Sequence, residues 1–265
     1  MRAIAAGLSD VGKQRAHNED RFILLPEFSV YVVADGMGGH QSGEVASRMA
    51  ASTIASFFRK GDAEKAKGGT EEGGVGERLR AAVSHANSRI YARADDSRAH
   101  RGMGTTVVAA AYSPGEGVLY VAHAGDSRGY RLRNGELTQL TRDHSLVSDA
   151  LLERPDLSQA DLAYLPRNVI TRALGIGPTV DLDLYADKAE LGDVYLLCSD
   201  GLHGLVTDEE MAAVIGDNPL LTNACSELVE LANAAGGKDN ITAVLIRIEE
   251  DDAPWSVGRG PVSRS

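Results

Sequence analysis

Cysteine is scarce in this sequence: its 265 residues include only Cys198 and Cys225. The two residues form neither a CxxC pair nor a zinc-binding spacing, so neither a disulfide framework nor a structural zinc site is expected. Cys198 lies within an apolar run and is predicted to be a buried core thiol. Free thiols suit a reducing compartment, and we therefore predict a cytoplasmic location.

Long apolar runs are also lacking. The first residues, Met1 to Gly7, turn polar too soon for a signal peptide, and no run approaches the length of a membrane span. The formal net charge of −11 argues against nonspecific binding to DNA or to anionic membranes. We therefore expect neither nucleic acid nor a membrane among the partners.

The composition that remains is that of an ordinary globular protein, with 43% hydrophobic and 25% charged residues. Short runs rich in β-branched and aromatic residues predict strands, and Asn134-Gly135 is a strong hairpin signal. The predicted strands span residues 22–25, 29–34, 105–112, 118–122, 129–133, 194–198 and 241–248.

Helical periodicity is present in several segments. It predicts helices over residues 43–58, 77–94, 208–215 and 219–234. Ser42 and Thr207 are the predicted N-caps of the first and third helices, and Gly236-Gly237 is predicted to end the fourth. The segment 61–76 is rich in glycine, glutamate and lysine, so we predict a mobile loop there.

The order of these elements indicates the fold class. Hairpin-linked strands interrupted by a few helices lack the alternation of a doubly wound parallel sheet. We therefore predict an α+β fold of mainly antiparallel sheets covered by helices. It forms a single domain over residues 1–248, with a mixed helix-and-coil excursion over 143–178 and a disordered tail over 249–265.

Acidic residues fall at the boundaries of the predicted strands. A single aspartate there would be read as a turn former or a helix cap. If the strands stack so that these boundaries meet, the carboxylates share one cleft and repel each other, unless a divalent cation binds. Oxygen ligands select Mg²⁺ or Mn²⁺, and the sequence shows no histidine and cysteine cluster that would favour zinc. The acids concerned are Glu19, Asp20, Asp35, Asp126, Asp200 and Asp239.

The loop after the strand 29–34 is rich in glycine, from Asp35 to Gly39. Such loops often bind phosphate, but Asp35 precedes the glycines, and their spacing does not match the dinucleotide-binding fingerprint. Gly36 beside an acid instead allows the backbone to approach a bound ion closely. A metal ligand is therefore favoured over a nucleotide site.

A series of motifs occurs along the chain in a recognisable order. The motifs are Arg15 to Asp20, Ala34 to Gly39, Gly104 to Thr106, Gly125 to Arg128, Ser199 to Gly201 and Lys238 to Thr242. Together they closely resemble the bacterial metal-dependent serine/threonine phosphatases of type 2C, over roughly residues 5–248. The resemblance implies a four-layer α-β-β-α sandwich with two Mn²⁺ or Mg²⁺ ions at one end.

The same resemblance implies roles for individual residues. Asp35 should bridge the two ions, with the Gly36 carbonyl as a further ligand. Asp200 and Asp239 should complete the direct ligands of one ion, and Arg15 should bind the substrate phosphate.

Outer ligands follow from the resemblance in the same way. Glu19 and Asp20 should act mostly through water, and Asp126 could hold a third ion together with Asp200. Some relatives have a further acid where this chain has Gly204. The excursion 143–178 matches the flap of the family, which lies beside the active site.

The implied activity is hydrolysis of phosphoserine and phosphothreonine in proteins by a metal-activated water, opposing serine/threonine kinases. The proton donor is unassigned: Met37 replaces the histidine of many eukaryotic relatives, and His40 is a nearby candidate. Phosphorylated proteins and kinases are the expected partners of a monomer. An inactive scaffold is the alternative from another class, but it predicts loss of metal acids that this chain retains.

Overall fold

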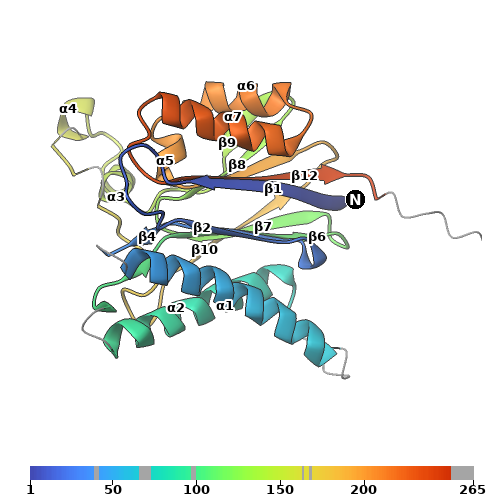
Figure 1. Ribbon diagram of the computed structural model, residues 1–265, viewed down its shortest axis with the longest axis horizontal. Helices are drawn as coiled ribbons and strands as arrows, with labels where there is room; N and C mark the ends of the chain where they lie inside the picture. Colours follow the sequence, from blue (N-terminus) through green and yellow to red (C-terminus); the bar gives the residue numbers. More distant parts are fainter. Residues whose placement is uncertain (39–41, 66–72, 97–99, 163, 167–168, 252–265) are drawn as a thin grey trace, which may run out of the picture.

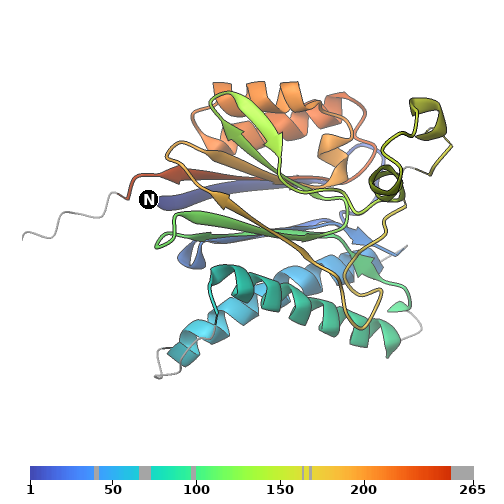
Figure 2. The same cartoon turned by 180° about the vertical axis from the view of Figure 1, so that it is seen from behind.

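Two antiparallel sheets pack face to face, and helices cover both outer faces (Figures 1 and 2). The computed structural model describes residues 1–251 except 39–41, 66–72, 97–99, 163 and 167–168. The predicted α+β class and the implied four-layer sandwich are confirmed.

The first sheet has the strand order β1-β12-β11-β8-β9. Its strands are β1 (Arg2–Asp10), β8 (Arg128–Arg133), β9 (Glu136–Gln139), β11 (Val194–Cys198) and β12 (Ile241–Glu249). The predicted hairpin joins β8 and β9, and both of its turn residues, Asn134 and Gly135, have positive φ angles of 53° and 82°. These angles are those of a two-residue hairpin turn that matches the twist of the strands.

Strand β1 was not predicted. Its sequence is poor in β-branched residues, but it pairs with β12 along its whole length, from Arg2 opposite Glu249 to Asp10 opposite Ile241. This pairing also corrects the predicted tail, because Glu249 belongs to β12. Residues 252–265 of the predicted tail lie outside the described residues.

The second sheet has the strand order β10-β7-β6-β3-β2. Its strands are β2 (Arg21–Leu25), β3 (Val30–Ala34), β6 (Val107–Ser113), β7 (Val118–Ala124) and β10 (Asp183–Lys188), and a short ribbon pairs β4 (Gly36–Met37) with β5 (Gly104–Thr105). A 3-10 turn over Pro26–Phe28 joins β2 to β3. Strand β10 lies at the edge of the sheet and, among the described strands, pairs only with β7. It was not predicted because its sequence is largely polar. The predicted strand 105–112 is divided at Thr106, whose amide donates to the Asp35 carbonyl instead.

Successive side chains of the central strands point to opposite faces of their sheet. They form three apolar layers, one between the two sheets and one between each sheet and its helices. In β3, Val30 and Val32 face helices, whereas Tyr31 and Val33 face the other sheet. Strand β12 is likewise buried on both faces, which explains its nearly continuous apolar sequence.

Helices α1 (Ser42–Lys65) and α2 (Val75–Asp95) cover the second sheet, and α6 (Asp208–Asp217) and α7 (Leu221–Ala234) cover the first (Figure 1). The predicted loop 61–76 was therefore too long: residues 61–65 and 75–76 are helical, and 66–72 lie outside the described part. Ser42 is the first helical residue of α1 rather than a residue that precedes it.

Helix ends follow the predicted chemistry elsewhere. Thr207 accepts from the Glu210 amide, and the Glu210 side chain accepts from the Thr207 amide, which makes a capping box. Beyond α7, Gly236 and Gly237 both have positive φ angles, as expected at a helix end.

Three short helices lie at the end of the sandwich opposite the N-terminus, the end at which Figure 1 also shows β4 (Figures 1 and 2). They are α5 (Asp200–His203), α3 (Leu146–Glu153) and α4 (Gln159–Leu162). The last two belong to the predicted excursion 143–178. No described helix is long and apolar enough to cross a membrane.

Candidate metal centre

A cavity of about 560 Å³ opens at this end of the sandwich. Segments far apart in the sequence meet there: the loop before β2, the turn between β3 and β4, the start of α5 and the loop before β12. Six of the predicted site residues line the cavity, namely Arg15, Glu19, Asp35, Gly36, Asp200 and Asp239.

Asp35 leaves the end of β3 and is held through its backbone. Its carbonyl accepts hydrogen bonds from the Thr106 amide and the Thr105 hydroxyl, both at 2.8 Å. Burial, together with neighbouring carboxylates led by Asp20 and Asp200, raises the pKa of Asp35 well above its usual value. The two threonines are buried and therefore position the acid through its backbone.

Gly36 is required by close packing. A Cβ atom on Gly36 would collide with the Gly43 carbonyl at the start of α1. The Gly36 amide donates to the Glu19 carbonyl at 3.2 Å, so the three backbones are locked together. Burial raises the pKa of the Glu19 carboxyl, which lies at the same junction.

Asp200 is the first residue of α5. Its Oδ1 atom is buried without a hydrogen-bond partner among the described residues. Burial, and then the charge of Asp239, raises the pKa of Asp200. Gly201 allows the start of α5 to lie close to the backbone of Asn240, because a side chain at position 201 would collide with the Asn240 carbonyl.

Arg15 and Asp239 form an ion pair across the cavity mouth, with Nη2 and Oδ2 2.6 Å apart. Both side chains are partly exposed. In the protein without metal, the guanidinium thus supplies positive charge to one of the predicted metal ligands.

Asp20 lies behind the cavity and is fully buried. Its Oδ2 atom accepts hydrogen bonds from the hydroxyls of Ser199 and Thr242, each at 2.7 Å, while Oδ1 has no partner among the described residues. Burial raises the pKa of Asp20 to about 6, although the hydroxyls oppose this shift.

Asp126 also lies outside the cavity lining. The neighbouring Arg128 donates to both carboxylate oxygens of Asp143, at 2.8 Å each. Burial and the charge of Asp200 raise the pKa of Asp126 to about 6. Electrostatic coupling to Asp200 is therefore present.

Asn240 was missed as a site residue. Its Oδ1 accepts from the Glu19 amide at 2.8 Å, and its Nδ2 donates to the carbonyls of Val11 and His17, each at 2.9 Å. The side chain thus fixes the loop that carries Arg15 against the start of β12. Its place directly after Asp239 was the available signal, but only the fold shows which loop it holds.

His123 and His144 correct the expectation that no histidine cluster exists, since their rings stack at 4.5 Å beside Asp183. Potential ligand atoms of the three residues lie within 4.8 Å of one another. However, Arg172 donates to Asp183 at 3.0 Å and lies 3.3 Å from His144 Nε2. A side-chain cation already occupies this position, so the cluster is an ion-pair network rather than a second metal site.

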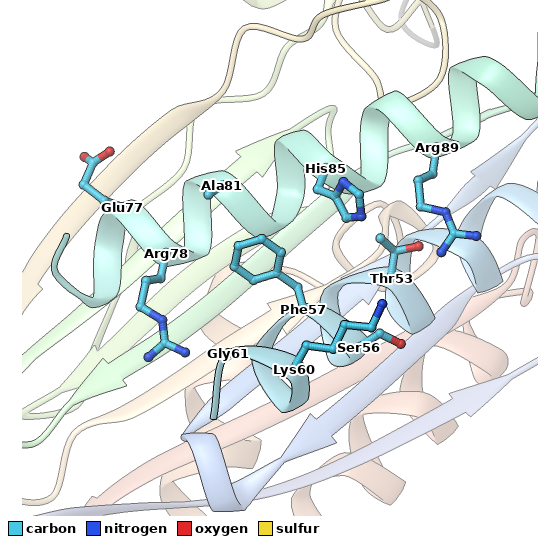
Figure 3. Close-up of a pocket in the computed structure, with 10 residues that line it drawn as sticks. All are labelled: Thr53, Ser56, Phe57, Lys60, Gly61, Glu77, Arg78, Ala81, His85 and Arg89. Carbon is cyan, nitrogen blue, oxygen red and sulfur yellow. The ribbon is translucent and has the colours of Figure 1, made fainter. Parts of the chain in front are cut away.

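Another groove, of about 530 Å³, lies between α1 and α2 on the outer face (Figure 3). Phe57, His85, Lys60 and Arg89 line it, and Glu77 is the one acid among the described lining residues. The described lining thus contains no cluster of carboxylates that would suit the predicted cations.

Comparisons with known proteins agree with this geometry. The family described as Protein phosphatase 2C matches residues 12–234. The chain belongs to the protein phosphatase 2C family. The family resemblance inferred from the motifs is thereby confirmed, and the chain is a phosphatase.

Relatives of this phosphatase cover nearly its whole length. The serine/threonine phosphatase stp of Listeria monocytogenes is 37% identical over 242 residues, which cover 90% of this chain and 93% of that protein. The structure of the Mycobacterium tuberculosis serine/threonine phosphatase PstP/Ppp matches with a TM-score of 0.81 and 36% identity, covering 94% and 100% of the two chains. A PstP catalytic domain in complex with two manganese ions matches with a TM-score of 0.77 and 35% identity, covering 94% and 99%.

The phosphatase cavity fits hard divalent cations. Its acids are carboxylates, which Mg²⁺ and Mn²⁺ prefer, and burial, followed by their mutual repulsion, raises several of their pKa values. The unpartnered Oδ1 of Asp200 is a donor position that a cation would satisfy. Met37 lines the cavity, whereas the proton-donor candidate His40 lies outside the described residues.

The buried acids predict a pH dependence for the metal-free phosphatase. The folded protein binds the Asp20 proton more tightly than the unfolded chain does. The stability that Asp20 contributes is therefore full below about pH 4 and is lost as pH rises through about 6. We compare the free energy of unfolding of an Asp20→Asn variant with that of the wild type, both in EDTA. The difference, variant minus wild type, should rise by roughly 2 kcal/mol between pH 4 and pH 7, because the wild type alone loses the contribution of Asp20. Urea unfolding at each pH measures this difference, and exposed Asp217→Asn is the control expected to show no such trend.

Proposed function

We propose that this phosphatase hydrolyses phosphoserine and phosphothreonine in proteins with the help of two bound Mn²⁺ or Mg²⁺ ions. The observation that carries the proposal is the convergence of carboxylates with raised pKa values, one unpartnered carboxylate oxygen and a guanidinium in one open cavity. The relatives named serine/threonine phosphatases, and the manganese complex of PstP, support the same assignment.

The residues that line the cavity would have two roles, metal binding and phosphate binding. Asp35 would bridge the two ions with help from the Gly36 carbonyl, and Asp200 and Asp239 would hold one of them directly. Bound divalent cations supply an acidified water and neutralise charge on the phosphoryl group. Arg15 has the planar pair of N–H donors that suits two phosphoryl oxygens, once a cation replaces it at Asp239.

Outer acids would act at longer range. Glu19 lies in the lining, and Asp20 directly behind it, so both are placed to hold the ions through water. Asp126 is coupled to Asp200 and would contribute to a third ion. Gly204, where some relatives have an acid, ends α5 and brings no side chain to this position.

A covalent phosphoenzyme on cysteine is disfavoured. Cys198 is fully buried in β11, and burial raises the pKa of its thiol far above its usual value. A buried neutral thiol is inert as a nucleophile. Direct attack by water therefore agrees best with the residues present.

The wider context follows from this activity. Phosphorylated proteins are the proposed substrates, serine/threonine kinases the opposing enzymes, and a monomer the working unit. Its one catalytic domain, predicted over residues 1–248, extends to Glu249 at the end of β12. Both cysteines are buried free thiols, which supports the proposed cytoplasmic location. The segment 143–178 is the proposed flap, since Ile170 from it reaches the cavity lining.

Hydrolysis of matched phosphopeptides tests the proposal. With Mn²⁺, a phosphothreonine and a phosphoserine peptide should release phosphate, because the open cavity admits a short side chain carrying the phosphate. Phosphate release is measured at several metal concentrations, with the unphosphorylated peptide as a blank. Absence of release from both peptides at saturating Mn²⁺ and Mg²⁺ would contradict the proposed function.

A further inference from the structure

A smaller pocket, of about 200 Å³, adjoins the metal cavity. Met37 and Ile170 line both hollows, so the two are continuous. Ile176 and Val180 continue the wall on the far side. The small pocket therefore begins where the site of the proposed phosphate chemistry ends.

A glycine lies next to two of the apolar side chains that line this pocket. A Cβ atom on Gly104 would lie 2.9 Å from Met37 Cε and 2.9 Å from Ile176 Cδ1. The absence of a side chain at Gly104 therefore leaves room for both of these apolar side chains, which line the pocket.

Ile176 is 57% exposed, yet its backbone is firmly held. The side chain of Asn87 in α2, which is buried, accepts from the Gly175 amide at 2.8 Å and donates to the Gly177 carbonyl at 3.1 Å. A large apolar side chain is thus presented to solvent by neighbours that are anchored on both sides. Such preorganisation lowers the entropic cost of binding a partner.

The rim of the pocket adds little net charge. Arg172 and Asp181 both line it, and they form an ion pair at 3.2 Å. Apolar walls with a compensated rim favour an aliphatic side chain over a charged one.

We propose that this pocket binds an aliphatic side chain of the phosphoprotein substrate, at a residue that flanks the phosphorylated serine or threonine. The inference rests on the proposed function and adds a substrate preference to it. The pocket is continuous with the metal cavity, where the phosphorylated residue would bind. A neighbouring residue of the same peptide is therefore the proposed occupant of the pocket.

A leucine scan tests this subsite. A phosphothreonine peptide with alanine at the flanking positions is compared with versions carrying one leucine at each position from three before to three after the phosphothreonine. One or two positions should raise kcat/KM about tenfold, the gain that an apolar pocket provides for a few extra carbons. The gain should vanish in Ile176→Asp and persist in Ile176→Leu.

Controls separate the possible outcomes. Ile176→Asp should hydrolyse p-nitrophenyl phosphate and the alanine peptide as the wild type does, with unchanged thermal unfolding, because Ile176 is mostly exposed. Leu152→Asp, at an equally exposed leucine of α3 outside the pocket, should keep the leucine preference. Hydrolysis without any positional preference, or a preference that survives Ile176→Asp, overturns the subsite alone. No hydrolysis of any substrate overturns the proposed function and the subsite with it.

Discussion

An Asp35→Asn variant should lose phosphatase activity by about 1,000-fold or more while keeping its fold. Asp35 lines the cavity, and its pKa is raised by burial and by the acids around it. An amide in its place cannot neutralise two cations, and loss of transition-state charge stabilisation worth about 4 kcal/mol corresponds to this factor. Release of phosphate from the phosphothreonine peptide at saturating Mn²⁺ measures the effect.

Stability separates this effect from misfolding. Removing a buried carboxylate relieves repulsion, so Asp35→Asn in EDTA should unfold at the same temperature as the wild type or higher. Asp217→Asn, an exposed change of the same chemistry at the end of α6, should retain full activity. Wild-type turnover by Asp35→Asn would rule out the proposed bridging role.

Chelation should abolish hydrolysis completely and reversibly. EDTA removes the cations that the carboxylates of the cavity are proposed to hold. Among the described residues of the cavity lining, Arg15 is then the one arginine or lysine left to stabilise phosphoryl charge. Activity should return on addition of excess Mn²⁺. Undiminished activity in EDTA, after dialysis against the chelator, would exclude a metal-dependent mechanism.

Metal binding should also be visible without substrate. At about 100 times its dissociation constant, Mn²⁺ should add about 3 kcal/mol to the free energy of unfolding and raise the melting temperature by about 5–10 °C. At one fixed Mn²⁺ concentration, the shift should be larger at pH 7.5 than at pH 5, because the buried carboxyls must lose their protons before they bind the ion. In the Asp35→Asn variant, Mn²⁺ should raise the melting temperature much less than in the wild type.

Local sequence patterns predicted the parts of the fold that local chemistry determines. The Asn134-Gly135 hairpin and the Thr207 cap depend on residues a few positions apart, and both are confirmed. Strands β1 and β10 escaped prediction because their own sequences are weak strand formers. Their conformation comes from partners more than fifty residues away, β12 and β7.

The candidate site likewise combines features that the sequence predicts with features that depend on long-range contacts. Motif order brought six residues correctly to one cavity, and their individual roles stay predictions. It could not show that Asp20 lies behind the lining or that Asn240 holds the Arg15 loop, because both depend on how distant backbones approach. Stacking of His123 on His144 was equally invisible, since twenty residues of strand, hairpin and loop separate them.

The pairing of β1 with β12 has a consequence for how the chain folds during synthesis. Residues 21–124 supply α1, α2 and all strands of the second sheet except β10, so that half can collapse early. Strand β1 emerges before any of them, yet its hydrogen-bonding neighbour is complete only at residue 249. Until then its edge stays unpaired, and the first sheet must close through a contact of very high sequence separation. The slow step of folding is therefore expected to be the arrival of β12 between β1 and β11.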